Sequence, residues 1–499
     1  MRATSFLFGV IAAAVLHSEG AAMARPNVVF IIADDLGYGD LGCYGQTKIR
    51  TPHIDQMAAE GMRFTQHYSG NAVCAPSRCV LMTGRHPGHA QVRNNREYKP
   101  EGQEPLLAGT LTIPRQLKEG GYATGGFGKW GLGGPGSTGE PLKQGIDRWY
   151  GYNCQGVAHN YYATYLWDDG RKVDLSNPAF SAHDEFKPGE NPEDPKSYKR
   201  FQGKEYSADL IAEEARKFIR DNKDKPFFCY FPTTVPHLAL QVPDDSLSEY
   251  EGKWEDPPYK GGNGYLPHFA PRAAYAAMIT RMDREVGRLM DLVKELGLDD
   301  NTIFVFTSDN GPLTGFHAHL AGTDCDFFNS AGGLRNGKGF LYEGGIRLPA
   351  IVRWKGRVKA GSVSDRVVGF EDWMPTLLEL ADLTGKTPAD IDGISFAPTL
   401  LGGSQPERPF LYREFPAYGG QQSVRMGNWK GIRQNLMTTK KAAAQGIKPT
   451  FELYDLAADV REEHDVAAQH PDILAQMAVL MKQQHMPSKE FPFAALDKQ

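Results

Sequence analysis

Residues 26–35 of the 499-residue chain read Pro-Asn-Val-Val-Phe-Ile-Ile-Ala-Asp-Asp. The apolar run Val28–Ala33 is continuous and mostly β-branched, which is typical of a strand buried on both faces of a parallel sheet. The run ends in two carboxylates, Asp34 and Asp35. We therefore expect a central strand that carries two acidic side chains at its carboxyl end.

Three later stretches repeat this pattern of an apolar strand followed by polar residues. They are Tyr122–Gly128 before Lys129, Pro226–Phe231 before Pro236-His237, and Ile303–Ser308 before Asp309-Asn310-Gly311. Helix-like segments alternate with the strands at residues 54–60, 111–119, 206–221 and 272–296. This alternation predicts a doubly wound α/β sheet, whose ligands bind beyond the carboxyl ends of its strands.

The polar residues that follow these strands are expected to share one edge of the sheet: Asp34, Asp35, Lys129, His237, Asp309 and Asn310. Three carboxylates and an amide are hard oxygen ligands, suited to Ca²⁺ or Mg²⁺. Most aspartates after a strand are only turn formers or helix caps. The doubled Asp-Asp and the second Asp-Asn-Gly favour a cation site instead. A cation beside lysines indicates transfer of a sulfuryl or phosphoryl group.

A second informative stretch is Cys74-Ala75-Pro76-Ser77-Arg78, followed by the apolar Val80-Leu81-Met82. Proline in a first helical turn places Cys74 at a helix N-terminus, where backbone N–H groups favour an anion. One interpretation is a buried structural cysteine, the usual fate of a lone Cys. Another is a phosphatase-type thiolate, but that loop needs five residues between Cys and Arg, and residue 80 is Val. A third depends on the rest of the chain.

The third interpretation is the C-x-P-x-R signature, because the chain resembles a type I sulfatase of the alkaline-phosphatase-like superfamily. Six motifs in order carry the resemblance across nearly the whole mature chain: residues 34–40, 74–85, 128–130, 236–237, 308–311 and 337–349. The resemblance implies a large mixed, mostly parallel sheet flanked by helices, with a smaller C-terminal antiparallel sheet and helix. It also implies oxidation of Cys74 to formylglycine (3-oxoalanine) by a sulfatase-maturing enzyme.

The resemblance further implies the chemistry of each site residue. One hydroxyl of the hydrated aldehyde at Cys74 would attack sulfur, and the second would then expel sulfate. Asp34, Asp35, Asp309 and Asn310, with the oxidised Cys74, would bind Ca²⁺ in preference to Mg²⁺. The remaining residues follow the family pattern. Arg78 would hold the diol, Lys129 and Lys338 would contact sulfate oxygens, and His237 with Lys338 would protonate the leaving alkoxide.

One departure from the family pattern concerns the base that triggers sulfate release. Many sulfatases carry a histidine two residues after the motif lysine, but Gly131 stands at that position here. The candidate replacement is His159, within the aromatic stretch Tyr150–Trp167. The alternative is that His159 is a histidine of the sugar pocket.

The substrate is expected to be a sulfated hexose or hexosamine residue, removed by an exo-acting enzyme. Two long polar stretches, Asp168–Glu205 and Ser246–Pro271, are expected to wall its pocket, since long loops in compact domains are usually functional. His317, His319 and Asp324 follow the last metal-binding strand and are candidates to bind sugar hydroxyls. Two other classes remain open: a phosphodiesterase or phosphonate monoester hydrolase of the same superfamily, and a catalytically silent glycan-binding protein.

The two ends of the chain predict a targeting segment and a second structural subdomain. Arg2, an apolar run and an A-x-A-like site predict a signal peptide over residues 1–24, hence a periplasmic or extracellular protein. The catalytic domain is expected over residues 25–389 and an α+β subdomain over 390–499. A formal net charge of −5 argues against nucleic acid as a partner, and no later segment is apolar enough to span a membrane.

Overall fold

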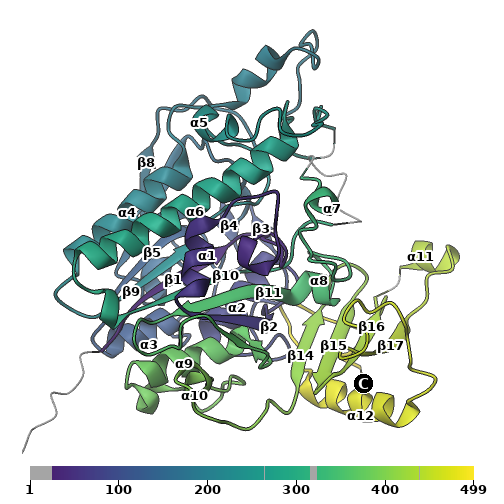
Figure 1. Cartoon of the computed structure of the whole chain (residues 1–499). Helices are drawn as coiled ribbons and strands as arrows, with labels where there is room; N and C mark the ends of the chain where they lie inside the picture. The colour runs from purple at the N-terminus through teal and green to yellow at the C-terminus, as the bar shows by residue number, and fades with distance from the viewer. Residues whose placement is uncertain (1–24, 263, 315–322, 438, 499) are drawn as a thin grey trace, which may run out of the picture.

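Strand β1 (Asn27–Ala33) lies in the middle of an eleven-stranded sheet, as the opening stretch predicts (Figure 1). Its two neighbours, β10 (Thr302–Ser308) and β9 (Phe227–Pro232), both run parallel to it. The computed structural model describes residues 25–499 apart from 263, 315–322, 438 and 499. The predicted signal peptide and both His317 and His319 therefore lie outside the described residues.

The strands of the large sheet follow the order β12-β2-β11-β10-β1-β9-β5-β6-β7-β8, and β13 also pairs with β2. The central strands β10, β1, β9, β5 and β6 are parallel, whereas β11, β7 and β8 run antiparallel to their neighbours. This confirms the mixed, mostly parallel sheet. The remaining strands are β2 (Met62–Tyr68), β5 (Ala123–Lys129), β6 (Arg148–Tyr152), β7 (Tyr165–Asp168), β8 (Arg171–Asp174), β11 (Arg347–Arg353), β12 (Ser362–Ser364) and β13 (Val368–Gly369).

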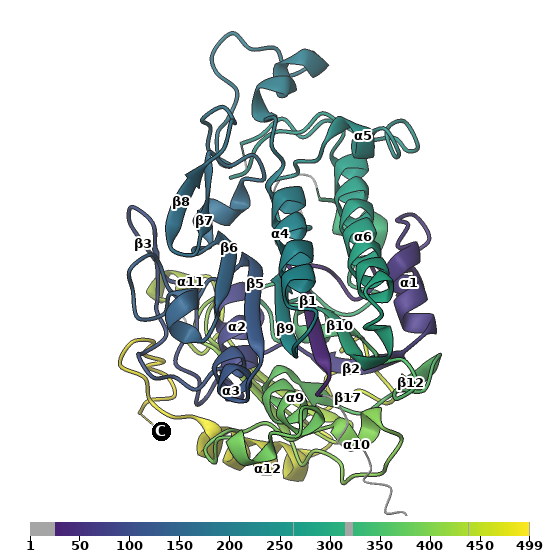
Figure 2. The ribbon, with the colours of Figure 1, turned by 90° about the vertical axis from the view of Figure 1, so that its left-hand side faces the viewer.

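Helices cover both faces of the sheet, and β1 shows why. Val29 and Ile31 pack into the core under one helical layer, whereas Val28 and Phe30 pack into the core under the other. The first layer holds α1 (Pro52–Ala59), α4 (Ser207–Asp221) and α6 (Pro271–Glu295). The second holds α2 (Cys74–Thr83), α3 (Ile113–Glu119) and α9 (Trp373–Leu380). Figures 1 and 2 show α4 and α6 lying together on one side of the sheet, away from α3 and α9.

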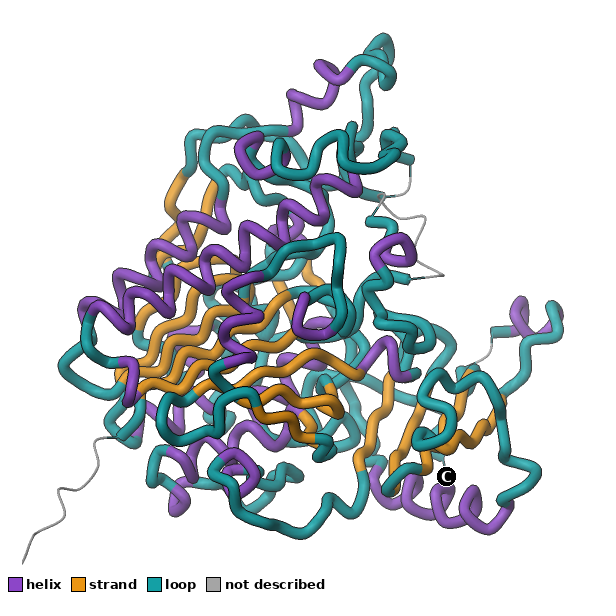
Figure 3. Tube along the Cα trace, in the orientation of Figure 1, coloured by secondary structure: helices purple, strands orange, loops and turns teal. Residues whose placement is uncertain are grey.

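A separate four-stranded antiparallel sheet forms the C-terminal part, as the resemblance implied (Figure 3). It contains β14 (Leu411–Phe415), β15 (Gln421–Met426), β16 (Trp429–Gln434) and β17 (Thr450–Asp455). Helix α12 (Pro471–Gln484) packs Met477 and Met481 against Val424 and Leu453 of this sheet. The boundary expected near residue 390 stays a prediction, since α10 (Ala397–Leu400) still packs into the core of the large sheet.

The other strands and α-helices of the described chain are short. They are the hairpin β3 (Glu97–Tyr98) with β4 (Gly102–Gln103), and the helices α5 (Asp244–Leu247), α7 (Cys325–Phe328), α8 (Glu343–Ile346) and α11 (Lys440–Ala444). Within the described ranges, no helix combines the length and the apolar character needed to cross a bilayer.

Candidate active site

The carboxyl ends of four parallel strands bring the predicted residues to one edge of the sheet. Asp34 and Asp35 follow β1, Asp309 and Asn310 follow β10, Lys129 ends β5, and His237 lies just beyond β9. All six side chains are buried. Asp35 has a left-handed backbone, φ 64°, and its N–H donates to Asp309 Oδ1 at 3.1 Å. This contact ties the two acidic strand ends together.

Cys74 is the first residue of α2, and Val73 before it is extended, so the predicted helix N-terminus is confirmed. Its Sγ lies 3.6 Å from Asp34 Oδ1 and 3.7 Å from Lys338 Nζ. Burial raises the pKa of the Cys74 thiol to about 12, although Lys129 and Lys338 oppose the shift. At neutral pH the unmodified thiol is therefore protonated and a poor nucleophile.

Arg78 lies one turn along α2 and is completely buried. Its Nε and Nη2 donate to Asp309 Oδ2 at 3.0 and 2.8 Å, and its Nη1 donates to the carbonyl of Lys129 at 2.6 Å. The guanidinium thus joins the ends of β10 and β5 to the helix that carries Cys74. Charged hydrogen bonds in a buried site fix geometry strongly.

Two lysines pair with the carboxylates beside Cys74. Lys129 Nζ donates to Asp34 Oδ2 at 2.6 Å, and Lys338 Nζ donates to Asp35 Oδ2 at 2.7 Å. Burial alone raises the pKa of Asp34, but Lys129, helped by His237 and Arg78, holds it well below its usual range. Burial also opposes the charge on Lys338, but Asp35 and its neighbours raise the pKa of that ammonium well above its usual value. Both lysines are therefore protonated.

The loop that carries Lys338 is held from three directions. The Lys338 N–H donates to Pro312 O, and the Gly339 N–H donates to Ala72 O, both at 2.8 Å. Gln421 of β15 donates from Nε2 to Gly339 O at 2.7 Å. The C-terminal sheet thus supports the position of a lysine in the site.

The donor groups at this edge fit a divalent cation. One atom each of Asp34, Asp35, Cys74 and His237 can be chosen so that all lie within 4.8 Å of one another. Asn310 donates from Nδ2 to Asp35 Oδ1 at 2.7 Å and to Gly311 O at 3.0 Å, which fixes the orientation of its amide. Its buried Oδ1 has no hydrogen-bond partner among the described residues. A hard cation would supply the missing partner and neutralise the clustered carboxylates.

Three histidines form the outer side of the site. His237 Nε2 lies 3.5 Å from Asp35 Oδ2, and its Nδ1 donates to Leu238 O at 2.5 Å. The His159 ring stacks on His237 with a centroid distance of 4.6 Å and an interplanar angle of 9°. His159 Nδ1 lies 3.2 Å from His183 Nε2, and the Tyr265 ring lies 4.8 Å from the His183 ring. His159 therefore lies against His237, and its role as a base stays a prediction.

The structure gives a steric reason for glycine at residue 131. Gly131 has φ 78°, a left-handed conformation that favours glycine. A Cβ there would lie only 2.5 Å from Gln155 Nε2. The side-chain amide of Gln155 is buried and has no hydrogen-bond partner within the described part of the chain. The space next to the missing histidine is thus filled by an amide.

Asp324, predicted to bind a sugar hydroxyl, has a partner within the protein. It is the N-cap of α7, and its Oδ2 accepts from Arg272 Nε at 2.7 Å. Its contact with substrate stays a prediction.

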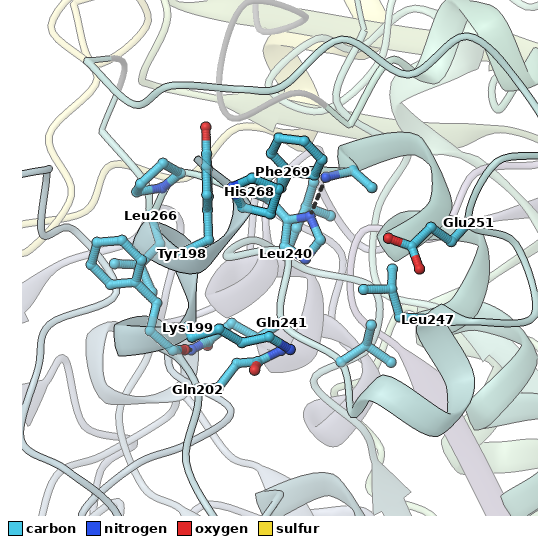
Figure 4. A pocket seen from close by; sticks show the side chains of 15 residues that line it. Tyr198, Lys199, Gln202, Leu240, Gln241, Leu247, Glu251, Leu266, His268 and Phe269 are labelled. Carbon is cyan, nitrogen blue, oxygen red and sulfur yellow. Dashed lines mark hydrogen bonds between the residues drawn. The ribbon is translucent and has the colours of Figure 1, made fainter. Parts of the chain in front are cut away.

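The two long polar stretches do reach the site, through residues that were not predicted from the sequence. His183 comes from the first stretch and Tyr265 from the second. In the sequence, only the length and polarity of these stretches indicated that they would lie near the site. They also enclose an apolar pocket, separate from the carboxylates, with Tyr198, Leu240, His268 and Phe269 in its lining (Figure 4).

The fold and the site define a hydrolase with an alkaline-phosphatase-like core. The chain belongs to the sulfatase family: the family model described as Sulfatase matches residues 26–383. A second model, described as N-sulphoglucosamine sulphohydrolase, C-terminal, matches residues 335–487. The protein is therefore a sulfuric ester hydrolase.

The similarity to individual sulfatases extends over most of the chain. The N-acetylgalactosamine-6-O-sulfatase of Bacteroides thetaiotaomicron is 31% identical, with 94% of each chain covered. Human arylsulfatase A is 32% identical over 93% of this chain and 88% of its own. The crystal structure of Ps i-CgsB in complex with k-i-k-neocarrahexaose has a TM-score of 0.72 at 27% identity, with 92% of both chains covered.

Proposed function

We propose that this protein removes O-sulfate from a sulfated carbohydrate, acting on a terminal hexose or hexosamine residue. The observation that carries the proposal is the convergence of Cys74, two lysines and the acidic strand ends at one buried edge. Similarity over 94% of the chain to an N-acetylgalactosamine-6-O-sulfatase supports a sulfated amino sugar as the substrate class. The predicted leader supports action outside the cytoplasm.

Oxidation of Cys74 to formylglycine by a sulfatase-maturing enzyme is part of this proposal. The hydrated aldehyde supplies two hydroxyl groups, one to displace the alcohol from sulfur and one to release sulfate. The raised pKa of the unmodified thiol supports the need for such a change. Cys74 also heads α2, where backbone N–H groups and the helix dipole stabilise negative charge.

Ca²⁺ is the cation proposed for the acidic edge. Asp34, Asp35, Asp309 and Asn310 would hold it through oxygen atoms, and the unpartnered Oδ1 of Asn310 supports this assignment. The cation supplies positive charge to the sulfate oxygens and acidifies the nearby hydroxyl groups when it is bound.

The chain's own groups position the sulfate and supply the proton. The ammonium groups of Lys338, next to Cys74, and of Lys129, next to Asp34, would offer fixed positive charge to the sulfate oxygens. Arg78 keeps the ends of β5 and β10 in place around α2. Lys338 Nζ lies 3.7 Å from Cys74 Sγ and can donate a proton to the leaving alkoxide. His237 lies nearby, with its Nε2 3.5 Å from Asp35 Oδ2.

A paired release assay tests the proposal. Enzyme whose Cys74 modification has been verified by peptide mass is incubated with defined sulfated monosaccharides and oligosaccharides, and with their phosphorylated counterparts. We expect release of sulfate, with no release by a Cys74→Ala variant. Turnover of phosphate esters alone would instead establish a phosphohydrolase, and binding without release would establish a silent glycan-binding protein.

A further inference from the structure

A short series of side-chain contacts connects an exposed loop to the site. His183 Nδ1 contacts the carbonyl oxygen of Gly264, and His183 Nε2 lies 3.2 Å from His159 Nδ1. The His159 ring in turn stacks on His237. His183 and Gly264 are both exposed, whereas His159 is half-buried. Both polar stretches therefore contact His159, the first through His183 and the second through Tyr265.

The hydrogen-bond partners of His183 and His159 determine which ring nitrogen of each histidine carries the proton. A carbonyl oxygen only accepts, so His183 must carry its proton on Nδ1 to bond Gly264. The Nε2 of a neutral His183 is then an acceptor, and His159 must donate to it from Nδ1. The proton of neutral His159 is thereby placed on Nδ1. Its Nε2 keeps a free lone pair and makes no hydrogen bond with any described residue.

The surroundings keep His159 in this neutral form. Burial lowers the pKa of His159 well below its usual range, and the positive charge of Lys129 and Lys338 adds to the shift. His237 and His183 are the other titratable groups that act on the ring. His159 is therefore neutral, and its hydrogen bond to His183 selects the tautomer.

We infer that His183 is a positioning residue that fixes His159 in the tautomer whose Nε2 can accept a proton from a hydroxyl group in the site. The inference rests on the proposed function, the release of sulfate from a carbohydrate through oxidised Cys74. His183 acts only through His159. On oxidised Cys74, Nε2 would accept the proton of the free hydroxyl group; the oxygen of that hydroxyl would then form the C=O bond as the C–O bond to sulfate breaks. The outgoing sulfate keeps that electron pair.

Two substitutions at His183 separate positioning from structure. Gln presents one amide donor and one carbonyl acceptor, so His183→Gln can bond both Gly264 and His159. His183→Leu fills similar space and can make neither bond. We expect kcat to fall about tenfold or more in the Leu variant, with less change in KM, and to recover largely in the Gln variant. Exposure of His183 favours normal folding of both, which thermal melting would verify.

A double-mutant comparison tests whether His183 acts through His159. In a His159→Ala background, His183→Leu is expected to cause no further loss of kcat, because the group it positions is already absent. His464→Leu is the matched control, since His464 is an exposed histidine whose side chain is 78% accessible. Additive losses in the double variant, or an unchanged kcat in His183→Leu, would overturn the inference.

A measurement without substrate keeps this inference separate from the proposed function. Nitrogen-15 NMR of labelled histidine distinguishes a protonated from an unprotonated ring nitrogen. We expect His159 to show a protonated Nδ1 in the wild type and in His183→Gln, and mixed tautomers in His183→Leu. A wild type that releases no sulfate would refute the function, whereas a protonated Nε2 on His159 would refute the positioning role.

Discussion

Gln155 occupies the space that a side chain at residue 131 would need, because its Nε2 lies 2.5 Å from the ideal Cβ position of Gly131. A histidine at residue 131 would require the Gln155 side chain to shift and would have to adopt a left-handed backbone. We expect Gly131→His to lower both the melting temperature and the rate of sulfate release. A variant with raised activity would contradict this expectation, because it would show that the Gln155 side chain moves aside at little cost.

Gly136 provides a matched control for this clash. It has the same φ of 78°, but a Cβ there would meet nothing within 4 Å. Both Gly131→Ala and Gly136→Ala carry the left-handed backbone cost of about 1–2 kcal/mol. Only the first displaces Gln155, so chemical denaturation should show a larger loss of unfolding free energy for Gly131→Ala. Equal losses would count against the steric account.

Replacement of Arg78 by Lys is expected to lower kcat by about 100-fold or more, by analogy with the loss of one electrostatic stabiliser from an active site. Lysine keeps the charge but cannot bond Asp309 Oδ2 and Lys129 O in the same fixed geometry. Arg85→Lys, a partly exposed position just after the same helix, is the control and should retain full activity. Steady-state kinetics on the two variants makes the comparison.

Calcium is expected to raise the melting temperature of chelator-treated protein. A ligand that binds only the folded state stabilises it by about 2.7 kcal/mol at a hundredfold excess over its Kd. The rise should be smaller with Mg²⁺, and smaller again in an Asn310→Ala variant, which lacks the unpartnered Oδ1. Identical melting curves with and without Ca²⁺ would remove the cation from the proposal.

His159→Ala is expected to retain sulfate on the enzyme after one turnover, because release would lack its base. Mass analysis of the peptide that contains Cys74, after a short incubation with substrate, would detect the added sulfate. An unchanged steady-state rate would instead favour a role for His159 in the sugar pocket.

The C-terminal tail should make stability depend on pH through His485. Its Nδ1 lies 2.8 Å from Glu414 Oε2 and its Nε2 3.0 Å from Asp497 Oδ1. Burial opposes the charge, but these carboxylates raise the pKa of His485 above its usual 6.5. The resulting stabilisation is fully present below pH 6.5 and is lost as the pH rises through the folded-state pKa.

The variant His485→Gln therefore tests the tail contact. Denaturation should show it to be less stable than the wild type at about pH 6 and nearly equal at about pH 9. His464→Gln, at an exposed site, is expected to show no such trend. A His485→Gln deficit that grows with pH would reverse the assigned sign.

Sequence reasoning predicted the elements whose local pattern matches their final environment. The apolar runs Val28–Ala33 of β1 and Ile303–Phe306 of β10 arise because both faces of these strands are covered. The side chains after the two strands meet because parallel strands end together. The same reasoning located the start of α2 at Cys74. The short strands β7 and β8, the last two at one end of the sheet, were not predicted, since exposed polar residues such as Lys172 give no continuous apolar run.

The outer residues of the site could not be predicted for a different reason. His183, Tyr265 and Gln155 reach the site from segments with no regular periodicity, and their contacts join residues far apart in the chain. The absence of histidine at residue 131 was visible, but the amide that fills its space is a property of packing. His317 and His319 lie outside the described residues, so their predicted contacts with sugar hydroxyls stay predictions.

The contact between Gln421 and the loop of Lys338 carries a consequence for the length of the functional chain. A fragment that ended before the second sheet would keep Cys74, the acidic strand ends and both lysines. Lys338 would lose one of the three anchors that hold its loop. Such a fragment would contain every reactive group and still be a poor catalyst, because it would lack part of the structure that fixes the position of Lys338.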